Sequence, residues 1–180
     1  PTMSVVDKPV VLYVDDEAGN LAAFNAAFRR DFDVRLAQSA DEAIEALDQE
    51  QVDVMITDQR MPTTTGINLV RAIKSSHPEV VKMILTGFAD HDVVLAALNE
   101  GLVYRFFEKP WIPSTIVSEV QGAHELLKGY RRRKSQLLEM RDNLQRGVNS
   151  VDELLGHLSA QKDDLGLGLA KELKDIFGGV

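Results

Sequence analysis

The sequence predicts an α/β protein, a doubly wound five-stranded parallel sheet with a long C-terminal helical or coiled-coil extension. Two observations predict the sheet. Five short runs of β-branched, aliphatic and aromatic residues alternate with segments whose apolar residues recur at helical spacing. The connections between them are short, as in βα units that cover both faces of a sheet. A third observation, an apolar repeat at spacings of three and four residues that continues beyond residue 126, predicts the extension.

The predicted strands differ in character. Residues 10–14 form a continuous β-prone run, as expected of a strand buried on both faces, whereas residues 33–37 alternate like a strand near the edge of the sheet. The other predicted strands are 54–58, 80–85 and 103–108. Helices are expected after each of the first four strands. Ser39 and Asp90 are predicted N-caps, and Gly101 is predicted to end the fourth helix.

Composition limits the class of protein. The chain has 180 residues with 44% hydrophobic and 27% charged residues, and a net charge of −8. This acidic balance argues against a dominant nucleic-acid-binding surface. The absence of cysteine excludes disulfides and thiolate metal sites. No apolar run approaches the roughly 20 residues that span a bilayer, and no signal peptide is apparent. We therefore expect a cytoplasmic protein without a membrane partner.

Chemically matched residues follow four of the predicted strands. Asp15 and Asp16 end the first, Asp58 the third, Thr86 the fourth and Lys109 the fifth. Because the carboxyl ends of parallel strands share one edge, we expect these side chains to converge. Three carboxylates in one pocket repel one another unless a cation lies between them, and hard oxygen ligands suit Mg²⁺. The set is typical of phosphoryl transfer, in which a carboxylate can itself be the nucleophile.

This set of residues resembles the receiver domain of two-component response regulators, and the resemblance covers about residues 8–125. It implies the flavodoxin-like strand order 2-1-3-4-5. It also implies that Asp58 accepts a phosphoryl group from a sensor histidine kinase. Magnesium would be bound directly by Asp16, by Asp58 and by the backbone carbonyl of Arg60, and through water by Asp15.

The same resemblance assigns roles to the neighbouring residues. Thr86 would hydrogen-bond the phosphoryl group, Lys109 would pair with it, and Phe106 would be the switch aromatic that turns inward as Thr86 moves. Arg60 and Phe88 occupy positions that flank the path of the attacking water in this family. Their bulk predicts slow self-dephosphorylation. The chain would catalyse only its own phosphorylation and dephosphorylation and would not be an enzyme otherwise.

Each residue also has a simpler interpretation. Asp15 and Asp16 could cap the first helix, Thr86 could be a turn residue, and Lys109 a solvated surface charge. Their joint occurrence at the right strand ends favours the receiver. Two other functions are compatible with a strand-end aspartate: a pseudo-receiver that serves as an assembly platform, and a phosphatase of the haloacid-dehalogenase kind. The phosphatase would need an acid two residues after the nucleophile, where this chain has Arg60.

The domain division predicted from the sequence is a receiver at 1–125 and a helical extension at 126–180. Within the extension Lys134 and Arg141 interrupt two heptad core positions, and Gly147 and the glycines after residue 165 weaken the helix. The extension is either a fifth helix that frays or a dimerisation or signalling helix; we favour a homodimer. The basic cluster 128–134 is interpreted as a solvated face. The stretch His124-Glu125-Leu126 faintly resembles the phosphorylatable box of a histidine kinase.

Overall fold

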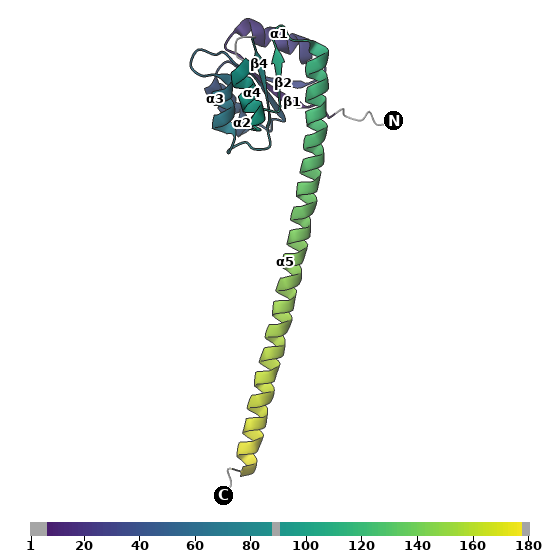
Figure 1. Cartoon of the computed structure of the whole chain (residues 1–180). Coiled ribbons are helices and arrows are strands. Elements are labelled where there is room, and N and C mark those ends of the chain that lie inside the picture. The colour runs from purple at the N-terminus through teal and green to yellow at the C-terminus, as the bar shows by residue number, and fades with distance from the viewer. Residues whose placement is uncertain (1–6, 88–90, 178–180) are drawn as a thin grey trace, which may run out of the picture. The chain divides into compact units, whose positions relative to one another are not determined.

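Strands and helices alternate along the chain in the order that the sequence predicts (Figure 1). The computed structural model describes residues 7–87 and 91–177, without the side chains of 91–94, 151, 158 and 162–177. The elements are β1 (Val10–Val14), α1 (Ala18–Phe28), β2 (Asp33–Ala37), α2 (Ala40–Gln49), β3 (Val54–Asp58), α3 (Gly66–Ile73), β4 (Val81–Thr86), α4 (His91–Asn99), β5 (Arg105–Glu108) and α5 (Pro113–Phe177). Backbone contacts divide the chain into two compact units, residues 1–129 and 130–180.

The strands of the first unit form one parallel sheet in the order β2-β1-β3-β4-β5. This order confirms the predicted doubly wound, flavodoxin-like fold, and it confirms that 33–37 lies at an edge. The three central strands are almost entirely buried, which explains their continuous apolar sequence. The chain order reverses beside β1 and β3, so their carboxyl ends border a crevice in which α/β proteins bind ligands.

Two apolar cores lie on opposite faces of the sheet. One joins α1 and the beginning of α5 to strand residues such as Tyr13 and Ile56. The other joins α2, α3 and α4 to the alternate residues of the same strands, such as Leu12 and Met55. Figure 1 shows the same division of the helices between the two sides of the sheet. Burial of large side chains such as Phe24 stabilises the fold by roughly 1.5–3 kcal/mol each.

The helix ends explain where the elements begin. Ser39 caps α2 as predicted, because its side chain accepts a hydrogen bond from the Glu42 amide. Thr65 caps α3 in the same way. Gly101 follows α4 with a φ of 66°, a conformation that glycine adopts without strain. The predicted cap at Asp90 lies outside the described residues. Strands β4 and β5 begin one and two residues later than expected, at Val81 and Arg105.

Helix α5 begins in the first unit and supplies the backbone of the second. It confirms the predicted long C-terminal helix. The glycines predicted to weaken the helix do not end it, since the helical backbone continues through Gly147, Gly166 and Gly168 as far as Phe177. A glycine in a helix costs only about 1 kcal/mol, which a long run of hydrogen bonds tolerates. Within the described ranges, no helix combines the length and the apolar character that a membrane crossing requires.

Candidate functional site

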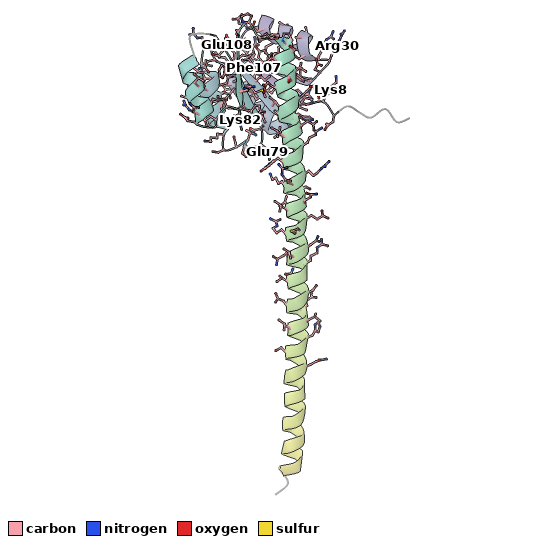
Figure 2. All side chains as sticks on the ribbon, turned by 45° about the vertical axis from the view of Figure 1, so that its right-hand side comes forward. Lys8, Arg30, Glu79, Lys82, Phe107 and Glu108 are labelled. Carbon is pink, nitrogen blue, oxygen red and sulfur yellow. The ribbon has the colours of Figure 1, made fainter. Side chains whose placement is uncertain are left out.

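The carboxyl ends of β1, β3 and β5 bring three of the predicted residues together. Lys109 Nζ lies 2.6 Å from Asp58 Oδ1 and 3.5 Å from Asp15 Oδ2. Lys109 follows β5, whose last residues Phe107 and Glu108 are labelled in Figure 2, and its amide donates to the Thr86 carbonyl. This backbone bond ties the lysine to the end of β4. The ammonium group therefore lies between the two buried carboxylates, as expected if all three residues belong to one site.

Asp58 is held by both its side chain and its backbone. Its carboxylate is buried, and Oδ2 accepts a hydrogen bond of 2.9 Å from the Arg60 amide. Gly66, at the start of α3, packs against the Asp58 carbonyl so closely that a β-carbon there would lie 2.5 Å from the oxygen. Gln59 connects this loop to the start of α3, because its side-chain oxygen accepts a hydrogen bond from the Ile67 amide. The loop after β3 thus fixes the position of Asp58.

Asp15 is the most completely hydrogen-bonded acid of the site. Tyr13 Oη donates to Oδ2 at 2.7 Å, the Glu17 amide donates to Oδ1 at 3.0 Å, and Asn20 Nδ2 lies 3.0 and 3.1 Å from the two oxygens. Sequence reasoning missed Tyr13 and Asn20. Two signals were present in the sequence: Tyr13 lies in β1 two residues before the acid, and Asn20 lies in the first turn of the next helix.

The charges of the site influence one another. Burial opposes the charged form of Lys109, but the hydrogen bond to Asp58 and the charges of Asp58 and Asp15 outweigh it and raise the pKa of this lysine. Burial also raises the pKa of Tyr13 strongly, and the bond to Asp15 and the nearby negative charges raise it further. Lys109 is therefore a fixed cation and Tyr13 a neutral donor at physiological pH.

The other predicted residues within the described ranges differ in burial and partners. Thr86 is fully buried, and its hydroxyl donates to the Gly87 carbonyl at 3.0 Å. Phe106 is half-buried and packs against the core that α2, α3 and α4 share. Asp16 is half-buried beside Asp15, and the Arg60 side chain is exposed. Phe88 lies outside the described residues.

The donor set suits a hard divalent cation, since it consists of carboxylates and backbone oxygens. The net charge fits as well, because one lysine offsets only one of the two buried carboxylates, Asp15 and Asp58. Asp15 has donors on both oxygens, so contact through water is easier for it than direct ligation. Within the described ranges, no three histidine or acidic side chains converge closely enough to hold a metal ion.

Comparison with known proteins identifies the family. The profile of the response regulator receiver domain matches residues 11–121. The chain belongs to this family. Its receiver domain is similar to the hydrogenase transcriptional regulatory protein HoxA of Cupriavidus necator, with 35% identity over 115 residues that cover 64% of this chain and 24% of the relative. A solved receiver domain protein from Clostridium thermocellum has 28% identity and a TM-score of 0.63, over 67% of this chain and 97% of the other.

A third similarity reaches further along the chain. The DNA-binding transcriptional regulator NtrC of Proteus hauseri is 26% identical over 159 residues, which cover 88% of this chain and 32% of the relative. The chain thus spans about a quarter to a third of the length of these curated relatives. Receiver domains of this family are phosphorylated by histidine kinases and in general are not enzymes in their own right. They typically bind Mg²⁺ in an acidic pocket.

Proposed function

We propose that this receiver domain accepts a phosphoryl group on Asp58 from a sensor histidine kinase and thereby switches an output or dimerisation surface. The observation that supports this most directly is the contact of Lys109 Nζ with Asp58 at 2.6 Å, beside the buried Asp15. A carboxylate oxygen of Asp58 attacks the phosphorus, forming an O–P bond as the bond from phosphorus to the donor's nitrogen or oxygen breaks. The leaving group departs with the electron pair of the broken bond.

The residues of the site divide this work among them. The Lys109 ammonium pairs with the phosphoryl oxygens, and the Arg60 amide holds the carboxylate in a fixed orientation. Magnesium, when bound, neutralises the charge of the transferred group. Asp16, Asp58 and the Arg60 carbonyl would hold it directly, and Asp15 through water. Tyr13 and Asn20 orient Asp15 for that contact.

Phosphorylation would act through Thr86 and Phe106. A phosphoryl group adds nearly two negative charges and three strong acceptors to Asp58. The Thr86 hydroxyl must give up its bond to the Gly87 carbonyl in order to donate to that group. Its movement leaves room for Phe106, which is half-buried, to turn inward. The surface around α4 and β5 then changes shape.

We further propose that the phosphorylated state is long-lived. Arg60 and Phe88 lie at positions two residues after Asp58 and two after Thr86, where bulky side chains obstruct the attacking water. After removal of the phosphoryl donor, the adduct should decay over minutes or longer when followed by intact mass. Decay within seconds would contradict this assignment.

The partners follow from the same function. The upstream partner is a sensor histidine kinase, and a homodimer through α5 is the favoured use of the second unit. The chain acts in the cytoplasm and catalyses only its own phosphorylation and dephosphorylation.

The test is intact-mass measurement after incubation with acetyl phosphate and Mg²⁺. Wild-type protein should gain about 80 Da, the mass of one phosphoryl group, and Asp58→Asn should not. EDTA should prevent the gain in wild-type protein. Asp31→Asn, which changes an exposed turn residue, is the matched control and should behave like wild type. A wild-type chain that gains no mass would contradict phosphorylation and favour the pseudo-receiver platform.

A further inference from the structure

Helix α5 carries an exposed apolar stripe within the second unit. The stripe has two rows, each with one residue every seven positions. Tyr130, Leu137 and Leu144 form the first row, and Val148 and Leu155 belong to the second, which is displaced from the first by four residues. These side chains are 49% to 67% exposed. A helix whose large apolar side chains are that exposed is expected to bury them against another helix. The second row begins with two cationic residues, Lys134 and Arg141, which precede Val148 and Leu155 at the same seven-residue spacing.

Charge is distributed unevenly along the same helix. Lys128 and residues 131–134 are all basic, whereas Asp152 and Glu153 are acidic and lie about 20 residues later. A parallel, in-register pair of helices would place each basic cluster beside its own copy. It would also place Lys134 opposite Lys134 and Arg141 opposite Arg141 in the core. Like charges at core and flanking positions oppose association.

We propose that the second unit pairs with a second copy of this chain in antiparallel orientation, with Leu137 opposite the partner's Val148. This inference rests on the homodimer proposed above and specifies its geometry. In this register Arg141 lies beside the partner's Leu144, and Tyr130 beside the partner's Leu155. Each layer then combines one residue from each row of the stripe, as antiparallel helix pairs require. No cationic core residue faces its own copy.

The register also makes the charges complementary. Arg131 lies on the same flank of the interface as the partner's Asp152, about two residues from the level position along the helix, and the symmetry of the dimer repeats this pair. The long stems of Lys134 and Arg141 cover apolar surface while their charged ends reach water. Met140, also exposed, faces the partner's Gly147, where no side chain obstructs it. The same sequence features that disfavour a parallel pair therefore favour this one.

Cysteine cross-linking of the full chain tests the orientation directly, because the native chain has no cysteine. Leu137→Cys and Val148→Cys are prepared separately, mixed, equilibrated in a glutathione buffer and analysed by intact mass. The proposal predicts a disulfide between the two different variants and none within either variant alone, since matching positions lie far apart in the antiparallel pair. Disulfides within each single variant would establish a parallel pair and overturn the proposal.

A matched mixture tests the register. Leu144→Cys mixed with Val148→Cys should remain uncross-linked, because these residues are displaced by a heptad. A disulfide in this mixture and none in the first would overturn the proposed register. Sedimentation of wild-type protein tests the homodimer separately from the phosphorylation of Asp58. A monomer at all concentrations would overturn the homodimer and its orientation, whereas phosphorylation of Asp58 is measured independently by mass.

Charge substitution gives a second measurement. Arg131→Glu should weaken the dimer about fivefold, because two flanking pairs become repulsive, and Arg131→Glu combined with Asp152→Arg should restore it. Salt provides a check without mutation: raising the concentration from about 0.05 M to 0.5 M should weaken an antiparallel dimer held by opposite charges. Stronger association in high salt would indicate that the basic clusters face each other and would overturn the proposal.

Discussion

Strand β3 has a buried aspartate at each end, and the two acids are held in different ways. Asp53 precedes the strand and is 4% exposed; Asp58 ends it and is 7% exposed. The Asp53 carboxylate accepts from the Val10 amide at 2.9 Å and lies 3.2 Å from His124 Nδ1. The Asp58 carboxylate contacts Lys109, whose side chain is 33% exposed. Each carboxylate accepts one backbone hydrogen bond, but Asp53 lies beside a buried histidine and Asp58 beside a lysine side chain that reaches water.

A lysine near each end of the parallel strands shows a similar difference. Lys82, near the start of β4, and Glu108, at the end of β5, lie at opposite ends of the sheet (Figure 2). The Lys82 ammonium donates to the His77 carbonyl, and burial lowers the pKa of this lysine. Lys109 lies between two carboxylates that raise its pKa against the effect of burial. The lysine at the amino-terminal edge is therefore bound to a backbone carbonyl, whereas the lysine at the carboxyl-terminal edge lies between two carboxylates.

The largest expected difference in stability is that between Asp53→Ala and Asp58→Ala. Asp53→Ala removes the buried acceptor of the Val10 amide and the carboxylate beside His124, and should lower the free energy of unfolding by about 3 kcal/mol. Asp58→Ala should change it by less than about 1 kcal/mol, since Lys109 can turn to solvent. Urea unfolding followed by circular dichroism measures both. Asp53→Ala should still be phosphorylated while folded; equal stability losses would contradict the contrast between the two edges.

A second prediction concerns the close packing behind Asp58. Gly66→Ala places a β-carbon 2.5 Å from the Asp58 carbonyl oxygen and should destabilise the protein by about 2 kcal/mol. It should also slow phosphorylation by acetyl phosphate, because the carboxylate moves with its backbone. Gly122→Ala is the control: it has no atom within 4 Å of the new carbon and should stabilise α5 by about 0.5–1 kcal/mol. Similar effects of both variants would show that Gly66 packs more loosely than described.

The hydrogen bond to Asp15 should contribute a smaller amount. Tyr13→Phe keeps the ring stacked on Phe24, with ring centres 4.0 Å apart, and removes only the donor to Asp15. We expect a loss of about 1–1.5 kcal/mol in unfolding free energy, with weaker Mg²⁺ binding in a fluorescence titration of Trp111. Tyr104→Phe, at an exposed position, should change stability by less than about 0.5 kcal/mol. Unchanged Mg²⁺ affinity in Tyr13→Phe would argue against its role in orienting Asp15.

The smallest expected effects concern the stability of Lys109→Met and Lys82→Met at alkaline pH. The raised pKa of Lys109 means that its stabilisation is complete below the ordinary value of 10.5 and is lost as pH rises through the raised value. The lowered pKa of Lys82 means that burial of its charge costs stability at neutral pH, and this cost disappears as pH rises towards 10.5. Urea unfolding from pH 8 to 11.5 measures the difference in unfolding free energy between each variant and the wild type. This difference should change in opposite directions with pH for Lys109→Met and Lys82→Met. Parallel trends would contradict the contrast.

Much of the candidate site was accessible from the sequence, because its residues follow strands of recognisable composition. Asp15, Asp58 and Lys109 converge as expected, since parallel strands end at one edge. Thr65, Tyr13 and Asn20 were missed, because their roles depend on side-chain directions that spacing alone does not specify. The short stretch around His124 resembled a kinase motif, but the structure buries this histidine, at 5% exposed, between Asp53 and Asp7.

The sequence by itself determined the fold class, the strand positions and the set of strand-end residues. Apolar periodicity and turn chemistry are local properties, and the rule that parallel strands end together then limits where the polar residues lie. Only the tertiary structure decided which partner each buried charge takes. Asp53 and His124 are 71 residues apart in the chain and meet because α5 packs against the sheet. A contact between distant segments depends on their packing, which no local pattern encodes.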